Sequence, residues 1–469
     1  MALSSALFSG ISGLGTLGNA MQIIGDNISN VNTIGFKGAT FTFQDLLSQA
    51  TSTMSGTSQV GRGVALGDIY STFEQGSFES TGNTTDLAIG GQGFFSLREA
   101  GSENLYYSRA GNFRFDQDGY LVNPEGYVVQ GWKLDQNGQD IGSITDILLD
   151  SFTSPPVASS RTTVITNLDS DAVSNYDTQL SGAWKGDHEA GIFMDDANYE
   201  YQTTVKVYDS LGSTHDITYY FDPDAATGAW EYIVVCNPSE DHRAGAAGAD
   251  LGLLARGSIT FSSSSGTITD LTMELNDGTG TWSDATIDSA GYFNFETNFG
   301  TGVNNIQFNI GTRDSSGGAA ATATWVNDSL TTTQFARAST TTFQSANGYG
   351  AGDLQGVDVD VTGVLTGVYS NGELIPLFRV ALAKFQNVQG LNKEGGNLFS
   401  ATRESGDAIT NRPGTNGLGD IAPNSLEQSN VDIATEFVRM ITTQRGFQAN
   451  GKIITVTDEM LSELINLKR

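Results

Sequence analysis

Apolar residues near both ends of the chain recur every seven positions, whereas the long middle alternates in the manner of strands. Near the N-terminus two interleaved rows share this spacing: Leu7, Leu14, Met21 and Ile28, and Leu3, Leu17, Ile24 and Val31, with Gly10 at the position between Leu3 and Leu17. A third row lies near the C-terminus: Ile433, Met440, Phe447, Ile454 and Leu461. Such rows occur in ordinary core packing, and they also form the seam of a coiled coil. The pattern predicts one helix at each end, with the two seams packed together.

The N-terminal helix is weak by itself. It carries several glycines: Gly10, Gly13, Gly15, Gly18 and Gly25. Each weakens a helix by up to about 1 kcal/mol relative to Ala. Asp26 is the only charged residue before Lys37, so no salt bridge supports the helix in isolation. A marginal helix needs a partner for its seam, and we expect the two ends to fold and pack when subunits self-assemble.

Local signals indicate where these helices end and begin. The first should stop around Asn30–Gly35, where Asn and Gly favour termination. The second should begin near Ser429, because Ser429 followed three residues later by Asp432 fits a capping arrangement.

The middle predicts many short strands joined by tight turns, because Gly is abundant at 57 residues and Pro scarce at 8. The fold class is therefore mainly β with α-helical termini. It is a discontinuous multidomain chain, with paired N- and C-terminal coiled-coil-like helices plus two or more β-rich domains. We expect these parts: 1–37 with 426–469 as a helical assembly domain, 38–80 as an extended linker, 81–150 with 350–425 as a first β domain, and 151–349 as a second β domain with room for an inserted subdomain.

The net charge of the chain limits the kinds of partner that it is expected to bind. The formal net charge is −30, and almost all of it lies between the two ends. Nucleic acids and anionic membranes select basic patches, so neither is expected as a partner. No apolar run approaches the length of a membrane span, and the first residues lack the features of a secretory signal peptide. The lone Cys236 cannot form an intramolecular disulfide, and its neighbours Val235 and Pro238 favour a buried structural thiol, because they provide no electropositive setting to activate it.

No stretch makes a convincing catalytic, cofactor or metal site. The glycine cluster Gly90–Gly93 is followed by a strand pattern instead of a helix, which favours a hairpin turn over a phosphate cradle. Asp116 and Asp118 do not match the spacing of a calcium loop. Asp209, Ser210 and His215 supply the residue types of a hydrolase triad, but no nucleophile elbow accompanies them. We therefore expect a protein that is not an enzyme.

Several motifs resemble the bacterial flagellar rod and hook proteins. They are Gly25–Lys37, Thr84–Phe95, Tyr107–Trp132, Gln428–Asp432 and Gln444–Asn450. A further motif, Tyr208–Gly212, resembles the second globular domain of hook proteins in particular. The residues that carry the resemblance are Asn27, Ser29, Asn30, Asn32, Gly35, Phe36, Asp86, Gly93, Phe94, Arg109, Gly111, Asn112, Tyr208, Asp209, Gly212, Ser429, Asn430, Val431, Asp432, Gln444 and Arg445. This chain departs from the family pattern at Gly25-Asp26, where Ala-Asn is common, and at Gly446.

The resemblance implies a structural subunit of the flagellar hook, located outside the cell and exported without a cleaved signal peptide. Such subunits pass through the flagellar type III export apparatus and assemble beneath a hook cap into a curved helical tube. That tube joins the rod to the hook-filament junction and bends while transmitting torque. The alternative within the family is a distal-rod or hook-filament junction protein. A hydrolase or glycan-binding β protein is the alternative from another class.

Overall fold

The computed structural model of the chain describes residues 2–53, 56–176, 178–188, 191–278, 280–316 and 323–466. Within these ranges, the side chains of 2–5, 49–53, 56–58, 60 and 464 lie outside the description. The chain divides into two compact units. Unit one comprises Met1–Phe152, Gln355–Val368 and Leu374–Arg469, and unit two comprises Thr153–Leu354 and Tyr369–Glu373.

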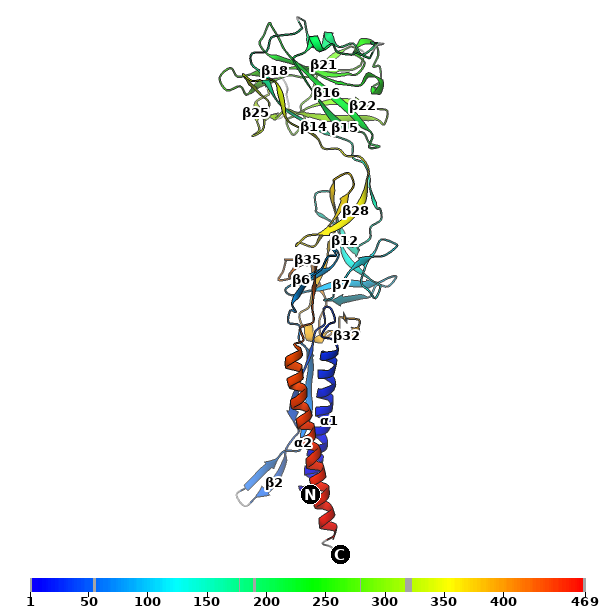
Figure 1. Ribbon diagram of the computed structural model, residues 1–469, viewed down its shortest axis with the longest axis vertical. Coiled ribbons are helices and arrows are strands. Elements are labelled where there is room, and N and C mark those ends of the chain that lie inside the picture. Colours follow the sequence, from blue (N-terminus) through cyan, green and yellow to red (C-terminus); the bar gives the residue numbers. More distant parts are fainter. Residues whose placement is uncertain are drawn as a thin grey trace. The chain divides into compact units, whose positions relative to one another are not determined.

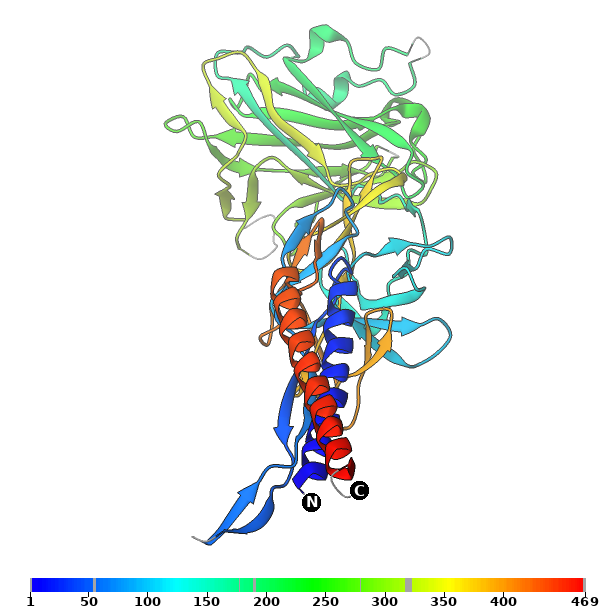
Figure 2. The same cartoon turned by 60° about the horizontal axis from the view of Figure 1, so that its bottom comes forward.

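Two long helices in unit one bring the chain ends together. Helix α1 spans Ala2–Ser29 and α2 spans Ile433–Asn466, and they lie side by side in both views of Figures 1 and 2. Helix α2 begins after Asp432, whose carboxylate accepts a 2.6 Å hydrogen bond from the Thr435 backbone N–H. The capping residue is therefore Asp432 rather than Ser429, whose hydroxyl instead accepts the Val431 N–H. A carboxylate suits this position because the helix N-terminus presents free N–H groups.

The stretch from 38 to 80, expected to be a linker, contains regular strand pairs. Strand β1, Ala39–Asp45, pairs antiparallel with β4, Val64–Ser71. Strand β2, Gln49–Thr53, pairs antiparallel with β3, Gly56–Val60. The two pairs form one long arm (blue in Figure 1), and β4 contacts α1. The alternating Phe41 and Phe43 explain β1, because alternation suits a half-buried strand.

The β region of unit one is built from both sides of the sequence. Its strands are β5 (Phe78–Ser80), β6 (Leu87–Gly90), β7 (Phe94–Glu99), β8 (Leu105–Ser108), β9 (Arg114–Phe115), β10 (Leu121–Val122), β11 (Tyr127–Leu134), β12 (Asp140–Asp146), β28 (Gly352–Val359, which begins in unit two), β29 (Val364–Tyr369), β30 (Leu374–Val380), β31 (Leu382–Lys384), β32 (Asn392–Gly395), β33 (Leu398–Ser400), β34 (Ile409–Asn411), β35 (Asp420–Pro423) and β36 (Ser425–Glu427). The main sheet has the order β29-β30-β11-β7-β8-β33-β32. An aromatic cluster of Phe73, Phe94, Phe385 and Phe399 fills one side of it. The region is therefore discontinuous, since neither half of the sequence forms the sheet alone.

Unit two is a β structure with its own core. Its strands are β13 (Thr153–Ser154), β14 (Arg161–Asp169), β15 (Tyr201–Tyr208), β16 (Thr214–Pro223), β17 (Trp230–Cys236), β18 (Leu253–Phe261), β19 (Ile268–Leu271), β20 (Glu274–Asn276), β21 (Trp282–Asp284), β22 (Phe293–Asn298), β23 (Val303–Asn309), β24 (Thr312–Asp314), β25 (Trp325–Asn327), β26 (Thr333–Phe335) and β27 (Thr340–Ala346). A sheet ordered β15-β16-β17-β18-β20-β21 and a second ordered β22-β23-β14-β26 share one apolar core that includes Tyr219, Trp230 and Phe308. The predicted fold class, mainly β with helical ends, is confirmed.

Candidate assembly site

Glycine and asparagine residues take part in the contact between α1 and α2. A Cβ atom added to Gly10 would lie 3.1 Å from Ile454 Cγ1, and one added to Gly13 would lie 2.9 Å from the Asn450 amide. Gly446 on α2 faces Leu17 in the same way, at 3.3 Å. Gly10 and Gly13 therefore allow the two helices to approach closely, whereas Gly15, Gly18 and Gly25 have nothing within 4 Å.

Two buried polar side chains of α2 satisfy their hydrogen bonds within the helix. Thr443 and Thr457 are buried, and their hydroxyls donate to the carbonyls of Arg439 and Ile453 at 2.8 and 2.7 Å. Ala20 and Ile24 are fully buried on α1. Heptad reasoning missed all of these residues except Ile24, because it follows only large apolar side chains.

The predicted seam is only partly covered within one chain. Ile24 is buried, whereas most of the seam is half-buried: Leu7, Leu14, Leu17, Met21, Ile28, Val31, Met440, Ile454 and Leu461. Ile433 and Phe447 are exposed. Leu3 lies in α1, but its side chain is outside the described residues. The chain therefore does not seal this seam by itself.

The outer side of the helix pair carries further uncovered apolar residues. On α2 these are Phe437, Val438, Ile441, Ile453, Val456 and Met460, and on α1 they are Phe8 and Ile11. Phe8 is 67% exposed and Val438 61% exposed. A helix that is apolar on both its inner and outer sides is normally buried all round. Contiguous apolar surface of this kind marks a protein–protein contact.

Buried charges join the helix pair to the β region. Lys37 Nζ lies 2.6 Å from Glu427 Oε1, and both side chains are 0% exposed. Arg109 Nη1 lies 3.3 Å from the other oxygen, Oε2. The Gly76 backbone N–H also donates to Glu427, at 2.9 Å. Burial lowers the pKa of Lys37 and of Arg109, against the opposing effect of the Glu427 charge. Glu427 therefore compensates two buried cations, which would be costly if left unpaired.

Signature residues surround this ion cluster and connect the chain ends. Asn27, in α1, exchanges two hydrogen bonds with the backbone of Ala39, at 2.8 and 2.9 Å. Asn430 accepts the Gly38 N–H at 2.9 Å and donates to the Thr72 carbonyl at 2.6 Å. These amides fix where the chain leaves α1 and where it enters α2.

Two signature glycines allow close backbone contacts in the same region. Gly35 has φ of 68°, and an added Cβ would lie 2.5 Å from the Ala110 backbone nitrogen. Its N–H donates to the Glu427 carbonyl at 2.7 Å. A Cβ at Gly111 would lie 1.8 Å from the Leu87 carbonyl oxygen. No side chain fits at either position, which explains why glycine belongs to the pattern.

The remaining signature residues of unit one divide into packed and exposed groups. Asp86 and Asn112 form a β-bridge, and Gly93, with φ of 134°, leads into Phe94 of the aromatic cluster. The Phe36 ring lies 5.7 Å from Lys393 Nζ, and Val431 lies against Gly38. In contrast, Ser29, Asn32, Gln444 and Arg445 are exposed, and Asn30 is half-buried. The exposed residues cannot be explained by packing within one chain.

The hook-like motif Tyr208–Gly212 lies apart from the others, in unit two. Asp209 accepts the backbone N–H groups of Leu211 and Ser213 at 2.9 and 2.7 Å, and Gly212 has φ of 84°. Burial pushes the pKa of Asp209 upward, but these N–H donors and His215 outweigh it, so the pKa is lowered. His215 Nδ1 lies 2.7 Å from Glu240, and its ring stacks on Phe299. The motif is a tight turn.

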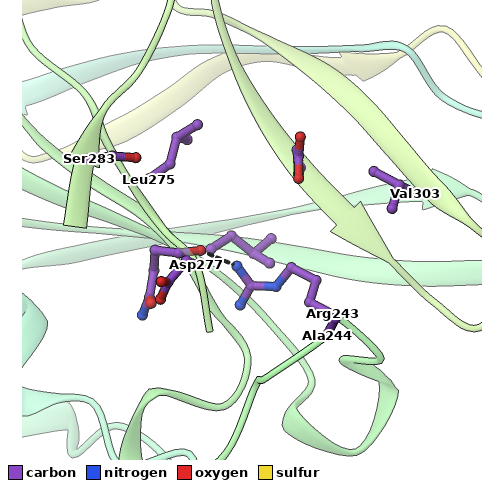
Figure 3. A pocket seen from close by; sticks show the side chains of 9 residues that line it. Arg243, Ala244, Leu275, Asp277, Ser283 and Val303 are labelled. Carbon is purple, nitrogen blue, oxygen red and sulfur yellow. Dashed lines mark hydrogen bonds between the residues drawn. The ribbon is translucent and has the colours of Figure 1, made fainter. Parts of the chain in front are cut away.

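The hydrolase arrangement considered from the sequence is not assembled at this turn. Ser210 is exposed, and within the described ranges the His215 ring faces the carboxylates of Asp209 and Glu240. A hollow of about 350 Å³ lies elsewhere in unit two, lined by residues that include Arg243, Leu275 and Val303 (Figure 3). The Arg243 guanidinium is already bonded to Asp241 and to backbone carbonyls. These contacts are structural.

The same question arises for metal-binding side chains, for the cysteine and for membrane-spanning helices. In the described part of the chain, no group of three or more His, Cys, Asp or Glu side chains is placed to hold a metal ion. Cys236 is buried, and burial raises the pKa of its thiol. Among the helices of the described ranges, none has the length and apolar character needed to cross a membrane.

Comparisons with known families match the chain in four places. Residues 7–37 match a flagella basal body rod protein family, and 422–467 match the flagellar basal body rod FlgEFG protein C-terminal family. Residues 88–165 match the flagellar hook protein FlgE/F/G D1 domain, and 175–349 match the flagellar basal body protein FlaE D2 domain. These matches, with paired terminal helices and separate β units, define the class of flagellar rod and hook proteins.

Full-length relatives narrow the class. The chain is 33% identical to flagellar hook protein FlgE of Borreliella burgdorferi, over 99% of both chains. It is 33% identical to the protein of that name from Treponema pallidum, over 99% of both, and 30% identical to that from Escherichia coli, over 100% of both. The chain belongs to the flagellar hook protein family. The resemblance found in the sequence is thereby confirmed.

Proposed function

We propose that the chain is the structural subunit of the flagellar hook and forms a curved, flexible tube that transmits torque from rod to filament. The observation that carries this proposal is the uncovered apolar surface on the helix pair, beside β units whose cores are filled within the chain. A subunit whose β units have buried cores but whose helices expose apolar side chains can bury those side chains by polymerising. The helices would form the inner wall of the tube and the β units its outer part.

The proposed role is structural rather than enzymatic. The acidic middle of the chain would remain hydrated, and wet polar contacts between outer units lose little when they rearrange. Bending would then occur between outer units, while apolar contacts between helices resist twist. We further propose the rod, the hook cap and the hook-filament junction proteins as partners. Export would use the flagellar type III apparatus, without a cleaved signal peptide.

Electron microscopy of concentrated full-length protein tests this proposal. The informative variant is Phe437→Glu/Ile441→Glu, which places charges on the exposed apolar side of α2. The matched control is Gln136→Glu, which adds a carboxylate at an exposed polar position in the β region, away from the helix pair. We expect curved tubes from the unmodified protein and the control and none from the variant. Straight tubes would favour the distal-rod alternative, and tubes from the variant would contradict the proposal.

A further inference from the structure

A hollow apolar surface lies where the β1–β4 pair meets α1. The residues that define it, here called the corner patch, are Phe8, Ile11, Leu46 and Leu47. They line a cavity of about 480 Å³ together with Ser12 and Arg62. Leu47 is 90% exposed. Apolar side chains held open around a concave surface indicate a docking site for an apolar partner.

The corner patch is held in place by hydrogen bonds to the backbone of Gly63 and Val64. The Val64 N–H donates to the Ser12 hydroxyl at 3.3 Å, and the Thr16 hydroxyl donates to the Val64 carbonyl at 3.2 Å. The Leu46 N–H donates to the Gly63 carbonyl at 3.1 Å. A Cβ at Gly63 would lie 2.1 Å from the Ser12 hydroxyl oxygen, so the strand can approach α1 only because this residue is glycine. The hollow is therefore part of the fold of unit one.

A matching convex surface lies on α2 of the same chain. Ile453, Val456 and Met460 form an exposed apolar stripe, here called the outer ridge. Gly10 contacts Ile454, so Phe8 and Ile11 are level with Ile453 and Val456 along the helix pair. Ile453, Val456 and Met460 are 46%, 38% and 48% exposed, and the corner patch is open, so neither surface is covered within the chain. One chain cannot bring its own ridge into its own patch.

Charges near the two surfaces are complementary. Arg62 lines the corner patch and makes no ion pair with any residue that the structure describes. Glu459 and Glu463 follow Val456 and Met460 by three residues each, which places both acids beside the outer ridge. A cation at the rim of one surface and acids at the rim of the other set the register of a contact.

We propose that the outer ridge of one subunit docks into the corner patch of the next, with Arg62 facing Glu459 and Glu463. This inference rests on the proposed function, because it names the surface through which the helices of neighbouring subunits meet. The two surfaces differ, so the contact is head-to-tail, and repeating it generates a ring or an open helix. Because both surfaces lie at one level of the helix pair, neighbours are related mainly by rotation about the tube axis.

Charge exchange between subunits tests the contact. The variants are Arg62→Glu and Glu459→Arg/Glu463→Arg, made in the full-length chain. All three residues are exposed, and basic residues near a helix C-terminus favour the helix. Each variant alone places like charges at every contact, and we expect the critical concentration for assembly to rise about tenfold. The control is Arg403→Glu, the same charge change at an exposed position in the β region.

A one-to-one mixture of the two variants gives the decisive result. In the mixture, each subunit that carries Arg62→Glu can alternate with a subunit whose ridge acids are reversed, so its new carboxylate meets arginines instead of acids. We expect the mixture to assemble close to the unmodified level. A mixture that assembles no better than its components would overturn the proposal, as would Arg62→Glu behaving like the Arg403→Glu control.

Cysteine cross-linking separates this contact from the proposed function. Leu47→Cys/Met460→Cys should give a ladder of disulfide-linked chains on oxidation, whereas either single variant should give at most dimers. If the unmodified protein formed no tubes but the ladder appeared at high concentration, the docking contact would stand and the hook proposal would fall. The absence of a ladder at concentrations where the unmodified protein forms tubes, or at the highest concentration tested if it forms none, would overturn the contact.

Discussion

Lys37 and Glu427 form a buried ion pair, at 2.6 Å, between residues that are 390 positions apart in sequence. Lys37 follows α1 and Glu427 precedes α2. The pair is therefore placed where both helices join the β region. Arg109 also contacts Glu427. One carboxylate therefore holds together three segments: the one where the chain leaves α1, the one where it enters α2, and the end of strand β8 in the sheet.

Glu427→Gln should strongly destabilise unit one. The change removes the carboxylate from between Lys37 and Arg109 and leaves two buried cations near each other, at a cost of about 3–5 kcal/mol. Lys37→Met should cost less, since Arg109 still faces Glu427. Denaturant unfolding measures both. Lys206→Met, which breaks an exposed pair with Asp216, is the control and should change stability by less than about 1 kcal/mol. Equal effects of Glu427→Gln and the control would contradict the assigned role.

The glycines of α1 should fall into two classes on substitution. Gly13→Leu places a side chain where Asn450 already lies and should cost about 1–3 kcal/mol through overpacking. Gly15→Leu meets nothing within 4 Å and should stabilise the helix by up to about 1 kcal/mol. Thermal loss of the helical circular dichroism signal, measured on unassembled protein, distinguishes them. Stabilisation by both substitutions, or the absence of a helical signal from α1 in the unassembled protein, would show that α1 does not pack on α2 in the free subunit.

Sequence patterns predicted the two helices and their pairing, but not the residues at which they approach most closely. Heptad rows predicted α1 and α2 because large apolar residues report helical periodicity. The close approach at Gly10 and Gly13 was hidden, because glycine in a helix signals only weakness until a neighbour is known to fill the space. One clue was available, since these glycines are three residues apart on one face.

The ion cluster could not be predicted for a different reason. Lys37, Arg109 and Glu427 meet only because three segments distant in sequence fold together, and no local pattern reports such a meeting. Two of its members are distinctive in the sequence. Lys37 is the first Lys or Arg of the chain, and Glu427 immediately precedes the C-terminal motif Gln428–Asp432. The motifs, in contrast, were recognisable from sequence, and Asn27, Gly35 and Asn430 meet around this cluster.

Leu14→Asp and Ile24→Asp should both abolish tube formation, but for different reasons. Ile24 is fully buried in the free chain, so its replacement by a charge should also separate α1 from α2. Leu14 is half-buried, so its replacement should leave the free subunit nearly intact and block assembly alone. Sedimentation measures assembly and circular dichroism measures the helices. Normal tubes from either variant would show that the seam is assigned to the wrong residues.

The turn at Asp209 should make the stability of unit two depend on pH in the acid range. Because the folded-state pKa of Asp209 is lowered, the unfolded chain binds more protons in the acid range. The contribution of the Asp209 charge to stability is fully present above the pKa of Asp in the unfolded chain, about 4. It is lost as pH falls through the lower pKa of Asp209 in the folded chain. Asp209→Asn should therefore be less stable than the unmodified chain at pH 6, with the difference shrinking as pH falls towards 2. Unfolding followed by tryptophan fluorescence measures this, since four of the five tryptophans of the chain, Trp230 among them, lie in unit two. Asp216→Asn, at an exposed position on the next strand, should leave the profile unchanged, and a gap that stayed constant with pH would exclude the charge of Asp209 as the cause.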